Sequence, residues 1–233
     1  MQGNRDQLLK VVIEQIKLPL IHMARQAELA SLTSTELDPA SISNIADMTI
    51  KLIDSYLLSL ATSDQIELGL EPVSLASVLQ NTADNLKGVA KLYNCEVELE
   101  LSGKYAPVMS NKNRLEAAFT MLGFSVIEAQ TVRSNNKKVN RVYLSTYKTA
   151  GGVSGGIFSP QIEIDNDDLR RGLNAAGTAR QGLPSVSHVS GAGIFIADAI
   201  FESLSSTLRA ARYHKMNGLA ATLIPSQQLR LIS

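Results

Sequence analysis

The N-terminal third of the chain places apolar residues at the spacing of helices that pack against other helices. Within residues 6–32 they alternate between four and three positions apart, at Leu9, Ile13, Ile16, Leu20, Met23, Ala27 and Ala30. This spacing predicts an amphipathic helix with one packing seam. A turn-prone segment, residues 33–39, precedes a second stripe at Ala46, Ile50, Ile53, Leu57 and Leu60. Residues 1–66 are therefore predicted to form a helical hairpin, kinked at Pro19 because proline lacks a backbone donor.

The second predicted helix carries more apolar surface than a lone hairpin can cover. Beside the first stripe runs another row, formed by Ile42, Ile45, Leu52 and Tyr56. This surplus favours a homodimer in which two hairpins form a four-helix bundle. The alternative is that the spare row packs on the domain that follows.

Residues 67–233 mix helical and strand patterns and predict an α+β domain. Helices are predicted over residues 75–92, 111–132 and 190–204, and strands over residues 95–101, 139–148, 157–165, 208–213 and 219–224. The glycine-rich segment 149–156 is interpreted as a flexible hairpin loop, because no Lys-Ser or Lys-Thr pair opens a helix after it. Residues 166–189 are predicted to be a long loop. The last hairpin is predicted to turn at Lys215-Met216-Asn217-Gly218, because Asn-Gly between apolar runs is a turn signal. The order of elements favours helices on one face of a mixed sheet.

Composition narrows the possible chemistry. The formal net charge is +0 over 233 residues, which argues against nucleic acid as a partner because such binders need a basic surplus. One cysteine, Cys95, excludes an internal disulfide, and His22, His188 and His214 are too far apart in sequence to suggest a metal site. No apolar run approaches the roughly 20 residues that cross a bilayer, so we expect no membrane insertion and a cytoplasmic location.

Several short sequence segments resemble the motifs of a histidine-kinase core and follow one another in the same order along the chain. They are Ile16-Lys17-Leu18-Pro19-Leu20, Glu71-Pro72-Val73-Ser74-Leu75, Asn113-Arg114-Leu115, Ser190-Gly191-Ala192-Gly193-Ile194 and the closing segment 219–225. They are similar to the end of the H-box, the link into the ATP-binding domain, the start of the N-box helix, the second glycine box and the last strand. The resemblance implies a dimerisation hairpin over residues 1–66 and a Bergerat-type α/β sandwich over residues 67–233.

At the phosphate-accepting position the resemblance breaks down. The histidine of the family would stand five residues before Pro19, where this chain has Glu14. A carboxylate cannot replace an imidazole in forming a phosphoramidate. The acidic neighbour that acts as a base falls at Gln15, which cannot accept a proton at neutral pH. No autophosphorylation is expected at this site.

The nucleotide-binding motifs are altered as well. The two N-box asparagines fall at Met121 and Ser125, and the base-recognition motif at Asp165 keeps its aspartate without its two glycines. A thioether offers no hard oxygen to Mg²⁺. If a nucleotide is retained, the resemblance assigns its contacts to Ser125, Asp165, Gly191 and Gly193. The two glycines fit either an anion site at a helix start or a tight helix entry without a ligand.

These residues lead to one main functional hypothesis and two alternatives. The main one is a catalytically degenerate, dimeric signalling scaffold that needs no ATP or Mg²⁺ and binds a protein such as a response regulator. The first alternative is a histidine phosphotransferase that uses His22, which lies eight residues after Glu14 on the same predicted helix. The second is a divergent ATP-binding kinase whose metal ligand comes from elsewhere, for example Glu128.

Overall fold

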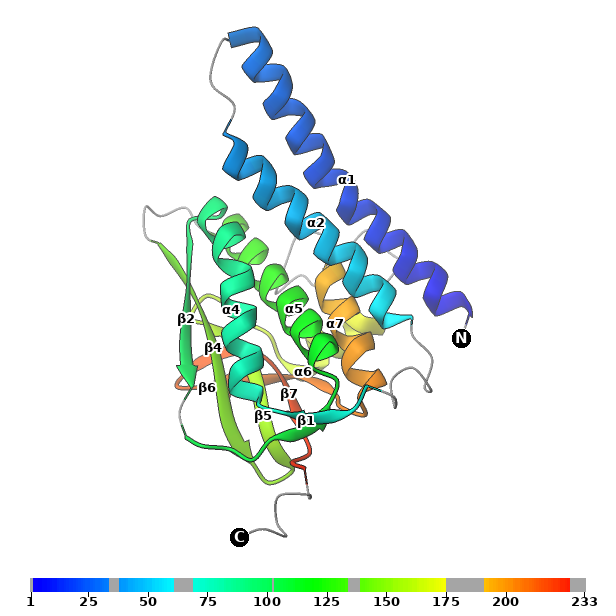
Figure 1. Ribbon diagram of the computed structural model, residues 1–233, viewed down its shortest axis with the longest axis vertical. Coiled ribbons are helices and arrows are strands. Elements are labelled where there is room, and N and C mark those ends of the chain that lie inside the picture. The colour runs from blue at the N-terminus through cyan, green and yellow to red at the C-terminus, as the bar shows by residue number, and fades with distance from the viewer. Residues whose placement is uncertain are drawn as a thin grey trace.

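A computed structural model describes residues 2–33, 38–60, 69–101, 103–133, 139–174 and 191–226. Helices α1 (Gln2–Thr33) and α2 (Pro39–Ser59) run antiparallel as a hairpin (Figure 1). Asp38 caps α2, since its Oδ1 accepts a hydrogen bond from Ala40 N at 3.1 Å, and Pro39 takes the first helical position. Helix α1 continues through Pro19 as one helix.

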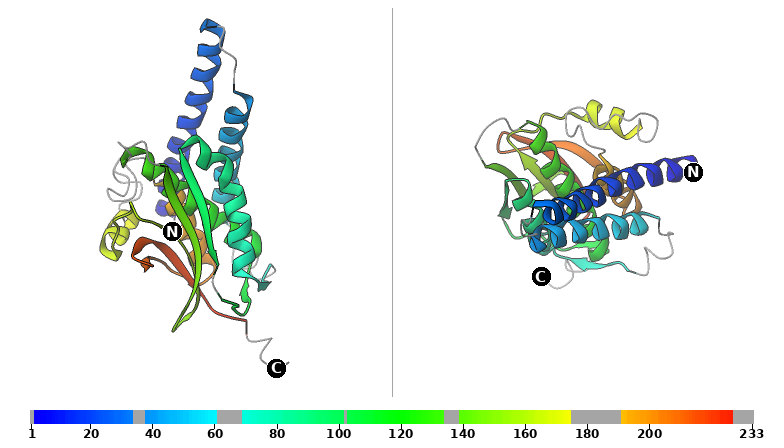
Figure 2. Two further views of the ribbon diagram at one scale, coloured as in Figure 1. Left: turned by 90° about the vertical axis from the view of Figure 1, so that its left-hand side faces the viewer. Right: turned by 90° about the horizontal axis from the view of Figure 1, so that it is seen from above.

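The rest of the described chain is built on a mixed sheet of five strands in the order β2-β4-β5-β7-β6. The strands are β2 (Cys95–Leu101), β4 (Asn140–Thr149), β5 (Gly152–Ser159), β6 (Leu208–Tyr213) and β7 (Met216–Leu223). Only β2 and β4 pair in parallel, and the other pairs are antiparallel. Helices α4 (Leu75–Leu92), α5 (Lys112–Arg133) and α7 (Ala192–Ser203) lie between the sheet and the hairpin (Figures 1 and 2). The predicted α+β class and mixed sheet are confirmed.

The hydrophobic core lies between the three helices and the sheet. The rings of Phe119 and Phe201 join α5 to α7 edge to face, with centroids 5.1 Å apart. The hairpin adds Val12, Met48 and Leu52 to this core. No helix of the described chain is long and apolar enough to cross a membrane.

Polar contacts fix the hairpin on the helices beneath it. Arg114 Nη1 of α5 donates to the carbonyl oxygen of Leu58 at 2.7 Å, near the C-terminal end of α2. This cation meets a carbonyl in the last turn of α2, where the helix carries a partial negative charge. Lys51 Nζ donates to Asn85 Oδ1 of α4 at 3.0 Å. The hairpin is thus held on both α4 and α5.

The two apolar rows of α2 differ in their exposure to solvent. Leu52 is buried and Ile42, Ile45 and Tyr56 are half-buried. Ile50, Ile53 and Leu57, from the other row, remain 55, 39 and 58% exposed. The following domain therefore covers one row and leaves the other open.

The region predicted as one long loop begins with a helix, α6 (Asn166–Asn174). Asn166 Oδ1 accepts from Ala210 N at 2.9 Å and attaches this helix to the edge strand β6, a long-range contact with no local sequence signal. The remainder of that predicted loop, with His188, lies outside the described residues. A short pair of strands, β1 (Glu71–Val73) and β3 (Val108–Ser110), was also not predicted.

Two glycine-containing turns are shorter than predicted, and only one end of each predicted segment lies in the turn. Most of the predicted flexible loop, Gly152 to Gly156, belongs to β5, where a Cβ on Gly155 would lie 2.8 Å from the Phe119 ring. The last hairpin turns at His214 and Lys215, whose φ values of +44° and +70° are left-handed. Gly218 lies within β7 instead, because a Cβ there would come 2.1 Å from the Ile157 carbonyl oxygen. Gly155 thus allows the sheet to approach α5, and Gly218 allows β7 to approach the backbone of β5.

Candidate functional site

The position that corresponds to the kinase phosphoacceptor lies on α1. Glu14 is exposed, whereas its neighbour Gln15 is only 3% exposed. Gln15 Nε2 donates to both carboxylate oxygens of Glu128, on α5, at 3.0 and 3.1 Å. The residue at the expected base position thus connects the hairpin to α5.

Glu128 is itself buried at this contact. Burial raises the pKa of its carboxyl to about 8, against a smaller opposing effect of the Gln15 hydrogen bond. At neutral pH this carboxyl therefore keeps its proton and is a poor ligand for Mg²⁺. Its position facing Gln15 favours a structural contact over the metal-ligand role considered above.

The residues at the N-box and second glycine positions pack directly against each other. Met121 and Ser125 are buried on α5. A Cβ on Gly193 would lie 2.4 Å from Ser125 Oγ and 2.5 Å from the Met121 carbonyl oxygen. Gly191 has a φ of +60° at the start of α7, a conformation that favours glycine. Helix packing and backbone geometry account for both glycines without a ligand, which favours the tight helix entry.

The side chain of Asp165, at the base-recognition position, forms a local hydrogen bond. Its Oδ1 accepts from Asp168 N at 2.7 Å and caps the start of α6. Within α6, Asp167 pairs with Arg170 and Asp168 with Arg171. The described residues contain no group of three acidic, histidine or cysteine side chains that could hold a metal ion. Met121, at the first N-box position, offers Mg²⁺ a thioether and no hard oxygen.

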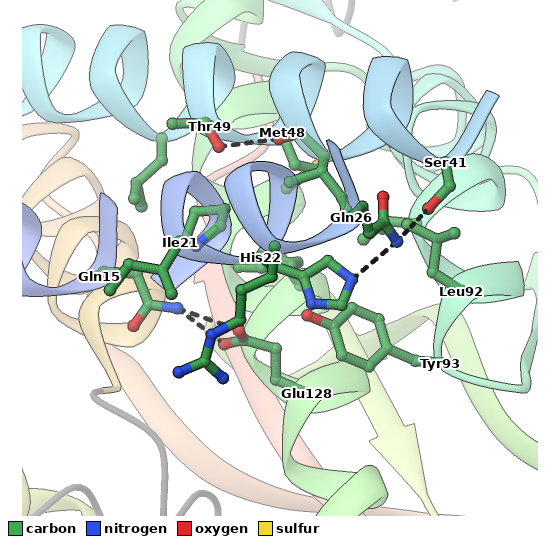
Figure 3. A pocket seen from close by; sticks show the side chains of 16 residues that line it. Gln15, Ile21, His22, Gln26, Ser41, Met48, Thr49, Leu92, Tyr93 and Glu128 are labelled. Carbon is green, nitrogen blue, oxygen red and sulfur yellow. Dashed lines mark hydrogen bonds between the residues drawn. The ribbon is translucent and has the colours of Figure 1, made fainter. Parts of the chain in front are cut away.

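His22 faces a cavity of ≈ 550 Å³ between the hairpin and helices α4 and α5 (Figure 3). The ring is solvent-exposed, and its Nε2 lies 3.0 Å from Gln26 Nε2. Gln26 Nε2 also donates to Ser41 Oγ of α2 at 3.4 Å. Figure 3 shows Gln15 and Glu128 toward one end of the cavity and His22, Gln26 and Ser41 toward the other.

This cavity was missed by sequence reasoning, although one signal was available. Gln15, Pro19, His22 and Gln26 are spaced four, three and four residues apart and all line it. That is the spacing of one helix face, offset from the apolar seam of α1. The structure brings His22 and Gln15 to this face, while Glu14 lies outside it.

The fold is that of a histidine-kinase core. No family model matches the sequence, and no curated protein matches it. Among solved structures, the histidine kinase AdeS of Acinetobacter baumannii is 15% identical with a TM-score of 0.55, covering 92% of this chain and 98% of that one.

Two further kinase structures share the arrangement of hairpin and sheet domain. Histidine kinase ThkA, in complex with the response regulator protein TrrA, is 11% identical with a TM-score of 0.54, over 92% of this chain and 60% of that one. Full-length ShkA, in complex with AMPPNP, is 16% identical with a TM-score of 0.52, over 95% and 46% of the two chains. Identities this low establish the likeness of fold and leave the chemistry to be argued from this chain's own residues.

Proposed function

We propose that this chain is a histidine-kinase-like signalling scaffold that acts as a homodimer through protein contacts and does not transfer phosphate from ATP. In this proposal residues 1–66 form the dimerisation hairpin, and residues 67–233 form a domain that braces it and contributes to partner binding. The protein acts in the cytoplasm and binds no nucleic acid.

The observation that carries this proposal is the use of the altered motif positions for packing. Gln15 contacts Glu128, and Gly193 packs on Met121 and Ser125. Asp165 caps a helix. These altered positions have structural roles, and exposed Glu14, at the phosphoacceptor position, offers no imidazole. A fold kept while its chemical groups are replaced is typical of a protein used for binding.

The exposed side of the hairpin supports the homodimer. On α2, Ile50, Ile53 and Leu57 form one uncovered stripe. On α1, Leu9, Ile13 and Leu20 are 41, 46 and 50% exposed at matching helical spacing. A second copy of the hairpin would cover both stripes in a four-helix bundle.

A response-regulator receiver domain is the partner class that we propose. The support is the ThkA structure, which contains a response regulator protein beside a chain of this fold. This chain would carry no phosphohistidine from which an aspartate of the receiver domain could accept a phosphoryl group. It would therefore control how much of the partner is free, and not the phosphorylation of the partner.

The test measures mass and phosphate incorporation on the same samples. The purified chain should elute as a dimer in light scattering, and Ile53→Lys should elute as a monomer, because the charge would be buried in the seam. Met109→Lys, which changes a side chain 40% exposed on β3, is the matched control and should remain dimeric. Radiolabelled Mg-ATP should leave no label on the chain. A monomeric parent chain, or stable labelling, would contradict the proposal.

A second candidate function is phosphotransfer through His22. It is favoured because the imidazole is exposed and contacts Gln26 through Nε2 only, among the contacts with described residues. Incubation with an acetyl-phosphate-charged receiver domain should then label the parent chain, whereas His22→Ala should lose the label. His214→Ala, which changes another exposed histidine, should retain it. Equal labelling of both variants, or none of the parent chain, would exclude this role.

A further inference from the structure

The cavity between the hairpin and helices α4 and α5 is lined by both polar and apolar side chains. Its volume, ≈ 550 Å³, falls in the range of small-molecule sites. The lining comes from four helices, with Gln15 and His22 on α1, Met48 on α2, Leu92 on α4 and Glu128 on α5 (Figure 3). A ligand there would contact the hairpin and the sheet domain together.

The apolar part of the lining is continuous with the core. It is formed by Ile45, Met48, Leu52, Val89, Leu92 and Phe124. Met48 and Leu52 are 5 and 2% exposed, and Phe124 packs edge to face on Tyr93 at 6.4 Å. A surface of this kind gains free energy by covering an alkyl or aryl group.

The polar part of the lining offers hydrogen-bond donors that the described chain does not use. Arg25 lines the cavity, and its guanidinium forms no hydrogen bond or ion pair with the described residues. The Tyr93 hydroxyl likewise has no hydrogen-bond partner there, and burial raises the pKa of this group to about 12, so that it keeps its proton. His22 contributes an exposed imidazole. Donors of this kind match an anionic oxygen group.

The charge balance limits the anion to a single charge. Among the described residues that line the cavity, Arg25 is the one permanently charged cation, and its planar fork fits a carboxylate. Glu128 is the one acidic side chain of the lining within the described part of the chain. Since burial keeps its carboxyl protonated at neutral pH, it does not repel an anion. A phosphate monoester would bring nearly two charges to one guanidinium beside an apolar wall.

We propose that this cavity binds a small monocarboxylic acid with an alkyl or aryl body, its carboxylate at Arg25 and His22 and its body against Met48 and Phe124. The inference does not depend on the proposed scaffold function, because it uses the inner face of the hairpin and not the exposed stripes. A bound acid would hold the hairpin on α4 and α5, and thus set which surface of the hairpin a partner meets.

The test uses 4-phenylbutyrate as the probe and 4-phenylbutyramide as its uncharged match. In the chain labelled with ¹³C-methyl methionine, titration should shift the Met48 signal, which is assigned by its loss in Met48→Leu. Calorimetry should give a Kd at least about tenfold lower for the acid than for the amide, the usual worth of a charge-assisted contact.

Substitutions then locate the carboxylate. Arg25→Met should weaken acid binding roughly tenfold and leave amide binding unchanged. Arg170→Met, at an exposed arginine of α6 outside the cavity, should change neither. Ile53→Lys should keep the site even as a monomer, so failure of the dimer and failure of this site are distinguishable.

Three results would overturn the inference. One is the absence of both heat and a Met48 shift at millimolar acid. Another is equal affinity for the acid and the amide. The third is loss of acid binding in Arg170→Met to the same extent as in Arg25→Met, which would indicate nonspecific charge attraction.

Discussion

Replacing Gly193 by alanine is expected to lower the free energy of unfolding by about 3 kcal/mol, the upper part of the range for overpacked interiors. The added methyl group would lie 2.5 Å from the Met121 carbonyl oxygen and 2.4 Å from Ser125 Oγ. The first of these atoms belongs to the backbone of α5 and cannot rotate away, so α7 must move. A loss of this size corresponds to a fall in melting temperature of roughly 6–12 °C for a chain of this length.

Two other glycines provide matched controls for this substitution. Gly151→Ala places its methyl group 3.7 Å from the nearest side-chain atom, Thr222 Cγ2, and should change stability by less than about 0.5 kcal/mol. Gly191→Ala places its methyl group 3.5 Å from the Phe195 ring, an ordinary contact, but keeps a φ of +60°, which costs about 1 kcal/mol for a residue with a Cβ. Urea unfolding of the three variants should therefore rank Gly193 as most sensitive and Gly151 as least. If Gly193→Ala is as stable as the parent chain, the packing explanation of this glycine is wrong.

The elements that sequence reasoning located well are those with a long local pattern. The first hairpin helix repeats the helical spacing from Leu9 to Ala30, α2 carries two such rows, and β2 alternates over all seven of its residues. The elements that it missed depend on distant partners. Helix α6 is held by the contact of Asn166 with Ala210, and Gly155 and Gly156 of β5 are explained by the rings of Phe119 on α5 and Phe158 within the sheet.

The candidate site shows the same limit more strongly. Asp165, Gly191 and Gly193 could be marked from the resemblance, but their structural roles could not. Gln15 and Glu128 stand 113 residues apart, and nothing near either residue indicates the other. The cavity likewise requires the docking of α1 on α4 and α5, which no local pattern encodes. Only the four, three and four spacing of its α1 residues could have drawn attention to that face.

Stability is expected to fall as the pH rises from about 5 to about 8, and Glu128 is expected to be a main cause. Burial raises the pKa of its carboxyl from 4.5 to about 8 in the folded chain. Below pH 4.5 both states hold the proton and the contribution to stability is complete. Between the two pKa values only the unfolded state releases it, so the unfolded state is favoured as the pH rises. The total loss from this group is on the order of 5 kcal/mol.

The substitution Glu128→Gln should remove this dependence while preserving the shape of the side chain. Its amide can still form a hydrogen bond with Gln15, so the variant should match the parent chain within about 1 kcal/mol near pH 5. At pH 9 it should be more stable by several kcal/mol, because it carries no charge into the interior. Glu14→Gln, at the exposed neighbour of Gln15, is the control and should differ from the parent chain by a constant amount across the range.

A second group contributes to the same slope and has to be separated from Glu128. Burial, with a smaller effect of Glu202, raises the pKa of Asp198 on α7 from 3.8 to about 7. As for Glu128, the contribution of Asp198 to stability is lost as the pH rises from its unfolded to its folded pKa. Glu128→Gln should therefore leave a residual slope of stability against pH that ends near pH 7. Adding Asp198→Asn should remove that residual slope of stability against pH as well. If Glu128→Gln has the same slope as the parent chain, the Glu128 carboxyl of the parent is ionised when folded. The argument that Glu128 does not repel an anion in the cavity would then fail as well.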